Sequence, residues 1–358
     1  MEVGHKMKIG IDISSMESNP AGIGQYTAGL LTALLTIDKK NEYFLYSTKP
    51  VYHEANNIVI PRSKFLPFKG IRWMQKVARD TKRRGIDMFI SPSNHLFALL
   101  LKNVATIIYD LSPIQYPTFF PRKGALVFKT GIRYFVPRSK FVFTISEVVK
   151  NDLAKLSKIP LEKIIVLYPS VNSSIKSKAI NFVDFGLPNN YLLTISTLQP
   201  RKNILELLDG FKAYLNQYPE SDLKLVIIGQ KGWYYKDIFK KVDTLDLNDY
   251  VVFPGYVDDK YIQSVLKGAK AFIYLSKAEG FGMPILEALN YDLPTIASDI
   301  PVFRECFEDA VFFIDPSKPS DVVEAINEAV TEGFKPIFDK ERYTWEKTAN
   351  KLLKAIAS

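Results

Sequence analysis

Cysteine, histidine and long apolar runs are scarce in this sequence. Its 358 residues include one cysteine, Cys306, and three histidines. A single cysteine excludes an internal disulfide framework and is typical of a reducing compartment. No apolar run approaches the ~20 residues that a membrane-spanning helix needs. The first residues, MEVGHKMKIGIDIS, lack the layout of a signal peptide. We therefore expect a cytoplasmic protein that has no spanning helix.

Acidic residues are scarce too, but only in the first half of the chain. Residues 1–183 contain 27 Lys and Arg against 12 Asp and Glu, a net charge of +15, whereas residues 184–358 contain 20 against 26, a net charge of −6. The length exceeds that of a usual single domain. We predict domains at 1–180 and 181–340 and a last helix at 341–358. Only the first domain is expected to meet an anionic surface.

The stretch EGFGMPILE at 279–287 is the most informative part of the sequence. It follows the apolar run 271–275, which is short and rich in aromatic and branched residues, as in a buried strand. A helix-compatible run follows it. Gly280 and Gly282 permit backbone angles that side chains forbid and let a ligand approach the main chain. At the helix start we expect three unpaired amides, those of Phe281, Gly282 and Met283. Such amides suit a phosphate or diphosphate.

Two carboxylates flank these glycines with seven residues between them. Glu279 is predicted at the strand end, and Glu287 roughly a turn and a half inside the helix. A ligand that lies across the N-terminus of the helix would contact both carboxylates. A second strand-to-helix turn, after the predicted strand 191–195, carries Arg201 and Lys202. A cationic pair at such a turn can neutralise a diphosphate.

The Glu-x7-Glu spacing resembles that of the retaining glycosyltransferases of family 4. The resemblance implies an α/β fold of the GT-B arrangement, in which two Rossmann-like domains have parallel sheets that face an interdomain cleft. It implies that Glu279 meets hydroxyls of a donor sugar, that Glu287 holds the ribose, and that Arg201 and Lys202 bind the donor diphosphate. It also implies a final helix that crosses back to the first domain. The turn expected to lie against the nucleotide base is Gly255, Tyr256 and Val257.

The turn Ala21-Gly22-Ile23-Gly24 lies between a predicted strand, 8–13, and a predicted helix, 23–37. Its amides are candidates for contact with a phosphate or an acceptor, and an ordinary loop is the alternative. The turn resembles a Gly-Gly-Ile-Gly turn of the family, with Ala21 in place of the first glycine. The methyl group of Ala21 limits how closely a ligand can approach the backbone at this turn.

His95 lies in the loop after the predicted strand 86–90, and Tyr109 and Asp110 lie at the end of the predicted strand 104–109. Because ligands gather at the carboxyl ends of parallel strands, these residues are candidates to meet an acceptor. Many family members carry His-Asp where this chain has Tyr109-Asp110, which leaves the role of this position open. Tyrosine is a poor base near neutral pH. Either His95 serves as the base instead, or it is a packed loop residue.

Two segments combine Lys and Arg with aromatic residues, 62–84 and 111–146. Such a composition fits an interfacial segment on an anionic membrane; the alternative is a solvated helix with an ordinary core face. No recognised nucleic-acid motif is present, so a nucleic-acid partner is not expected. The residues assigned to a membrane or acceptor surface are Lys69, Arg72, Trp73, Lys76 and Arg133.

The sequence therefore predicts a retaining hexosyltransferase that transfers a hexose from a UDP- or GDP-activated sugar to a glycan or lipid-linked acceptor. The resemblance implies no metal and no cofactor, a place in surface-glycan or lipid-linked oligosaccharide assembly, and peripheral contact with the inner face of the cell membrane. Two alternatives stay open: a non-catalytic, membrane-associated nucleotide-sugar-binding adaptor, and a nucleotide-sugar hydrolase or epimerase. The sequence names neither the donor nor the acceptor.

Overall fold

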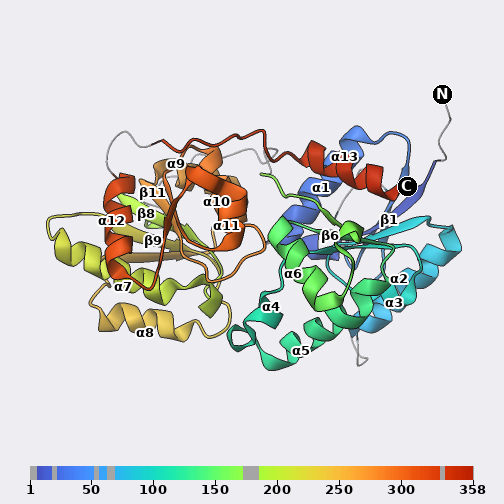
Figure 1. The fold of residues 1–358 in the computed structure, drawn as a ribbon, viewed down its shortest axis with the longest axis horizontal. Helices are drawn as coiled ribbons and strands as arrows, with labels where there is room; N and C mark the ends of the chain where they lie inside the picture. The colour runs from blue at the N-terminus through green and yellow to red at the C-terminus, as the bar shows by residue number, and fades with distance from the viewer. Residues whose placement is uncertain are drawn as a thin grey trace. The chain divides into compact units, whose positions relative to one another are not determined.

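A computed structural model describes residues 6–17, 22–51, 56–62, 69–171, 185–330 and 335–357. The chain forms two compact units, each built on a parallel sheet flanked by helices (Figure 1). The first unit comprises Met1–Pro117, Pro121–Ser170 and Tyr343–Ser358. The second comprises Thr118–Phe120 and Val171–Arg342.

In the described residues, the sheet of the first unit has seven parallel strands in the order β3-β2-β1-β4-β5-β6-β7. Most of these strands are buried along their length, as expected for a parallel sheet that is covered on both faces. Their bounds are β1 (Lys8–Asp12), β2 (Glu42–Ser47), β3 (Asn56–Val59), β4 (Met88–Ser91), β5 (Val104–Ile108), β6 (Phe141–Thr144) and β7 (Ile164–Val166).

The C-terminal helix packs within the first unit, side by side with the first helix of the chain (Figure 1). The ring of Tyr26 on α1 lies edge to face with Trp345 on α13, their centroids 5.1 Å apart. The helices of this unit are α1 (Ile23–Ile37), α2 (Lys69–Arg84), α3 (Phe97–Leu100), α4 (Ser112–Gln115), α5 (Arg122–Thr130), α6 (Glu147–Ser157) and α13 (Trp345–Ile356).

The described residues of the second unit form six parallel strands in the order β10-β9-β8-β11-β12-β13. Because chain order reverses between β8 and β11, the turns after these two neighbouring strands lie at the switch point, where ligands of doubly wound sheets bind. The strands are β8 (Tyr191–Ile195), β9 (Lys224–Ile228), β10 (Val251–Gly255), β11 (Ala271–Tyr274), β12 (Thr295–Ser298) and β13 (Phe312–Ile314).

Helices cover this second sheet, and α7 and α12 lie side by side (Figure 1). Asp258 caps α9, since its side chain accepts a hydrogen bond from the amide of Lys260 at 3.1 Å. The helices are α7 (Ile204–Gln217), α8 (Lys236–Thr244), α9 (Asp259–Gly268), α10 (Met283–Asn290), α11 (Pro301–Phe307) and α12 (Pro319–Val330).

The contact between α7 and α12 depends on a glycine. A Cβ added at Gly210 would lie 2.5 Å from Cγ1 of Val322. Overpacking of this kind typically costs about 1–3 kcal/mol, so Gly210→Ala is expected to lower the thermal unfolding midpoint, and adding Val322→Ala should restore much of the loss. The control is Gly124→Ala in α5, where the new Cβ meets nothing within 4 Å. Equal midpoints for Gly210→Ala and wild type would contradict this packing.

Candidate active site

The turns after β8 and β11 are joined through the main chain. The carbonyl of Arg201 accepts a hydrogen bond from the amide of Lys277 at 2.9 Å and from the hydroxyl of Ser276 at 3.2 Å. Asn203 ends the first turn in the left-handed conformation, with φ of 59°, before α7 begins. These bonds place Arg201 and Lys202 opposite the chain that leads to Glu279.

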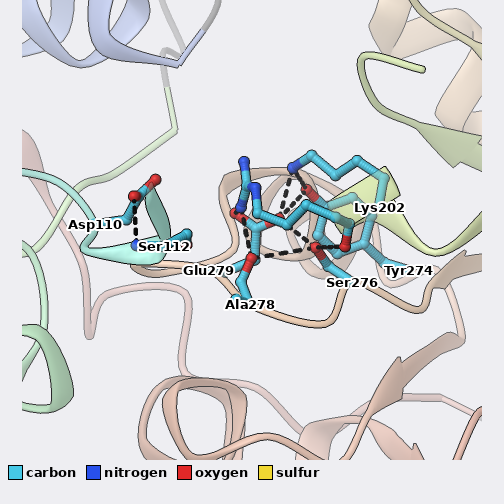
Figure 2. Close-up of polar contacts among 8 residues, drawn as sticks. Asp110, Ser112, Lys202, Tyr274, Ser276, Ala278 and Glu279 are labelled. Carbon is cyan, nitrogen blue, oxygen red and sulfur yellow. Dashed lines mark hydrogen bonds and ion pairs between the residues drawn. The ribbon is translucent and has the colours of Figure 1, made fainter. Parts of the chain in front are cut away.

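The carboxylate of Glu279 is at the centre of the site (Figure 2). Arg201 Nη1 lies 2.8 Å from Oε2, and Lys202 Nζ lies 2.6 Å from Oε1. The hydroxyls of Ser276 and Tyr274 also donate to Oε1, at 2.6 Å and 3.0 Å. Four donors therefore converge on one carboxylate that is mostly buried.

These partners decide the ionisation of Glu279. Burial by itself would raise the pKa of this carboxyl, but the charges of Arg201 and Lys202 outweigh burial and lower the pKa to about 2. Glu279 is thus a carboxylate at neutral pH. Because it faces two cations, the cluster has an excess of one positive charge.

The start of α10 supplies hydrogen-bond donors beside this cluster. Gly282 precedes the helix with φ of +117°, and a Cβ there would come within 2.9 Å of both Phe303 and Phe307. In the described part of the chain, the amides of Gly280, Gly282 and Met283 donate to no backbone or side-chain acceptor. Unpaired amides at a helix start and an excess positive charge together favour an anion.

Phe281, between these glycines, is a core residue. Its ring packs edge to face with Phe307, with centroids 5.5 Å apart. Glu287 lies in the second turn of α10 and is half-buried. Burial, and then the charge of Asp259, raise the pKa of Glu287 to about 7. Among the described residues no side chain or amide makes a hydrogen bond or ion pair with this carboxyl.

The predicted nucleotide-base turn closes β10. Gly255 has φ of +79°, and its carbonyl accepts a hydrogen bond from the amide of Gly229 at 2.8 Å. Val257 is buried, whereas Tyr256 is 45% exposed. Of the three residues, Tyr256 presents a large side chain at the surface.

In the first unit, Gly22 and Gly24 lie where α1 begins. Gly22 precedes the helix with φ of +42°, and Gly24 is buried in its first turn. Ala21 lies outside the described residues. The positive φ explains a glycine at position 22.

Tyr109 and Asp110 follow β5. The ring of Tyr109 packs edge to face with Tyr26, with centroids 5.1 Å apart, and burial raises the pKa of Tyr109 far above its ordinary value. Asp110 accepts a hydrogen bond from the amide of Ser112 at 3.1 Å, which closes the turn into α4 (Figure 2). Tyr109 is therefore neutral at physiological pH and Asp110 has a local structural contact.

His95 is packed in a loop. Its ring lies 5.5 Å from that of Phe128 and close to Gly131, and its Nδ1 is buried without a hydrogen-bond partner among the described residues. Burial lowers the pKa of His95 to about 4. The imidazole is thus neutral at physiological pH.

The predicted membrane surface on α2 needs one correction. Trp73 is 2% exposed and packs against Phe97, with centroids 6.0 Å apart, in the core of the first unit. Assigning Trp73 to that surface was wrong, because Trp73 lies with Met74 and Val77 of α2 in the core of the first unit. Arg72 and Lys76 are exposed, and the side chain of Lys69 is not described.

Arg133, on a π-helical turn after α5, is exposed and donates a hydrogen bond to the carbonyl of Leu156 at 3.3 Å. No described helix combines the length and apolar character needed to cross a membrane. Likewise, the described residues contain no group of three or more His, Cys, Asp or Glu side chains placed to hold a metal ion.

Three polar residues at strand ends were not predicted from the sequence. Tyr274 and Ser276 alternate at the end of β11 and both reach Glu279; their i, i+2 spacing before Glu279 was the available signal. Asp12, at the end of β1, is fully buried and accepts hydrogen bonds from the amide of Ser14 and from Asn94. An acid at a strand end was the signal there.

The raised pKa of Glu287 predicts pH-dependent stability. Below about pH 4.5, its ordinary pKa, the carboxyl is protonated in both folded and unfolded chains and has no electrostatic cost. Above about pH 7 the folded state must hold a charge that it disfavours. Glu287→Gln is therefore expected to stabilise the ligand-free protein by roughly 1–3 kcal/mol at about pH 8 and to have little effect near pH 4.5. Thermal unfolding across this range tests it, with Glu328→Gln on α12 as the exposed control; a pH-independent difference would contradict it.

Comparison with known proteins places this geometry in a family. Residues 177–357, half of the chain, match the family model for glycosyl transferases group 1. The chain is 28% identical over 318 residues to the O-antigen chain mannosyltransferase RfbU of Salmonella typhimurium, covering 86% of each. It is 25% identical over 223 residues to the O-antigen chain mannosyltransferase B of Escherichia coli, covering 61% of this chain and 58% of that one.

The crystal structure of Anabaena Alr3699/HepE, in complex with UDP and glucose, superposes with a TM-score of 0.74 at 15% identity. The match covers 99% of this chain and 100% of that one. Together with the two parallel sheets, this likeness confirms the predicted fold class, α/β of the GT-B arrangement with two Rossmann-like domains. The chain belongs to the glycosyl transferases group 1 family.

Proposed function

We propose that the protein is a retaining hexosyltransferase that moves a hexose from a nucleotide-diphosphate sugar to a glycan or lipid-linked acceptor. The observation that carries this proposal is the Glu279 cluster: one buried carboxylate that faces two cations, beside the unpaired amides of α10. The negative charge of a diphosphate would be stabilised by the two cations and the amides. The hydroxyls of a sugar would donate hydrogen bonds to the carboxylate.

The cations and amides would act most strongly on the leaving group. When the bond between the anomeric carbon and the diphosphate breaks, negative charge grows on the phosphate oxygens. Arg201, Lys202 and the amides of α10 stabilise that charge, and because Glu279 already holds both cations in place, they need little reorganisation. Glu279 in turn orients the sugar through its hydroxyls.

The acceptor proton needs a destination. Neither His95, whose pKa is about 4, nor the buried Tyr109 is a suitable base near neutral pH. We propose that the acceptor hydroxyl passes its proton to the leaving phosphate, on the face from which the phosphate departs. The acceptor oxygen then bonds to the anomeric carbon on that same face, which retains the configuration.

Arg201 and Lys202 supply the positive charge that a metal ion provides in other enzymes, so the proposed transfer needs no metal. Several relatives are named mannosyltransferases, among them RfbU, which makes mannose the first hexose to test. The cationic first half of the chain supports a lipid-linked acceptor at an anionic membrane.

A panel of UDP- and GDP-activated hexoses, in EDTA, tests the donor site. One donor is expected to raise the thermal unfolding midpoint, since binding to the folded state stabilises it. Lys202→Ala should abolish that shift. Lys241→Ala is the matched control, since this lysine in the same unit makes an ion pair with Asp209 and has no contact with Glu279.

Each outcome of this panel is informative. A shift that needs a divalent metal would contradict the metal-free mechanism. Binding that gives free hexose whether or not an acceptor is present would favour a hydrolase, and binding without any turnover would favour an adaptor. If no donor shifts the midpoint, the assignment of a nucleotide-sugar site is wrong.

Tyr274 offers a test of how Glu279 is positioned. Its hydroxyl accepts from Lys202 Nζ at 2.5 Å and donates to Glu279 at 3.0 Å (Figure 2). A hydrogen bond to a charged group contributes about 1.5–3 kcal/mol, so Tyr274→Phe is expected to lower kcat roughly tenfold or more, with KM for the donor changing less.

The matched control for Tyr274→Phe is Tyr191→Phe in the same unit. The hydroxyl of Tyr191 donates to the carbonyl of Val265 at 2.6 Å, away from Glu279. The Tyr191→Phe variant should be less stable than wild type but have an unchanged kcat. If both variants lose activity in proportion to stability, Tyr274 has only a structural role.

A further inference from the structure

The helix α5 (labelled in Figure 1) and the turn that continues it, Gly131–Phe135, carry exposed apolar residues on the side away from the core. One face is ordinary: Ala125, Phe128 and Ile132 point toward the core of the first unit. The opposite face is also apolar. Leu126, Val127 and Tyr134 on it are 66%, 68% and 63% exposed.

The spacing of Leu126 and Val127 places them in one stripe. Within α5, Leu126 and Val127 are adjacent and each lies three or four residues from positions 123 and 130, so these four positions share one side of the helix. Tyr134 lies on the π-helical turn that follows and is also exposed. A second stripe, displaced by roughly a quarter turn, is cationic, and its side chains are all exposed. The cations on and beside the apolar stripe are Arg122, Lys123, Lys129 and Arg133.

No acidic residue lies near these cations in the sequence. From Leu111 to Ser146 there is no Asp or Glu. An exposed apolar stripe costs free energy in water, and the absence of acids leaves the cations without local salt-bridge partners along this stretch. Both features favour a partner that is apolar inside and anionic at its surface.

We infer that this α5 face, defined by Leu126, Val127 and Tyr134 with the four cations beside them, docks on an anionic lipid bilayer. The apolar side chains enter the head-group region, and the cations meet lipid phosphates, as in interfacial amphipathic helices. A second copy of the chain is disfavoured as the occupant, because a symmetric contact would bring the same cations together. The inference deepens the membrane part of the proposed function and does not depend on sugar transfer.

The inference also distinguishes α5 from α2. Both helices are basic, but α2 turns its apolar residues, including Trp73, into the core. Exposed Ile71 is the exception on that helix. The α5 face is therefore the insertion element, whereas α2 contributes charge.

Sedimentation with vesicles of phosphatidylcholine, with and without phosphatidylglycerol, tests this in the full chain without donor or acceptor. Wild type should bind the phosphatidylglycerol vesicles and lose most binding at high salt. The double variant Leu126→Ser/Val127→Ser should bind at least roughly tenfold more weakly. The matched control is Leu161→Ser, at a 46% exposed leucine of the same unit, which should bind as wild type does.

The charge contribution has its own variants. Lys123→Gln/Lys129→Gln should weaken binding and reduce its salt dependence, whereas Lys102→Gln/Lys163→Gln, which removes the same charge from exposed sites elsewhere in the unit, should change binding less. A tryptophan reporter adds a readout that misfolding does not mimic. Fluorescence of Tyr134→Trp should be quenched by brominated lipid, and that of Leu161→Trp should not.

Three results would overturn the inference. The first is no binding of wild type to phosphatidylglycerol vesicles; the second is equal binding by Leu126→Ser/Val127→Ser and Leu161→Ser. The third is a wild-type dimer, seen by light scattering, that this double variant converts to a monomer without any vesicle binding. A donor-induced thermal shift that survives in the double variant would show that the donor site is intact, so failure of this inference is separable from failure of the proposed function.

Discussion

The ion pairs of Glu279 with Arg201 and Lys202 are the interaction on which the candidate site depends. Two cations in a mostly buried turn are tolerable because a carboxylate faces them, and that carboxylate stays ionised because they face it. Neutralising Glu279 would leave two buried charges without their partner. The same pairs fix both cations before any ligand binds, which is the preorganisation that electrostatic stabilisation of a leaving group requires.

The two glutamates of the central motif differ in chemistry although they belong to one turn and helix. Glu279, beside cations, has its pKa lowered to about 2, whereas Glu287, buried and near Asp259, has its pKa raised to about 7. Glu279 is thus a permanent charge. Glu287 changes protonation near neutral pH. When it is ionised, it lowers the stability of the folded protein without a ligand. A residue that destabilises the empty protein is a common sign that binding, rather than folding, explains its presence.

The described residues of the two units differ in the charges and donors that they present. The second holds the preorganised charges and the unpaired amides. In the first, neither His95, whose pKa burial lowers, nor Tyr109, whose pKa burial raises, is suited to act as a base, but the unit has the cationic, acid-poor segments and the exposed α5 face. This combination agrees with a mechanism in which the leaving phosphate takes the acceptor proton. Under the proposed function, the first unit would bring the enzyme to its acceptor and would not activate the acceptor chemically.

The sequence by itself determined the elements and the turns. The short apolar run at 271–275, the glycines that follow and the basic turn at 201–202 are local patterns, and local patterns report backbone conformation. Only the tertiary structure decided what those elements meet. Lys202 and Glu279 are 77 residues apart and become partners because β8 and β11 are neighbours in the sheet. Likewise, Trp73 turns inward while Leu126 and Val127 remain exposed. Burial and distant pairing, which also set every pKa described above, are properties of the packed chain and leave no local signature.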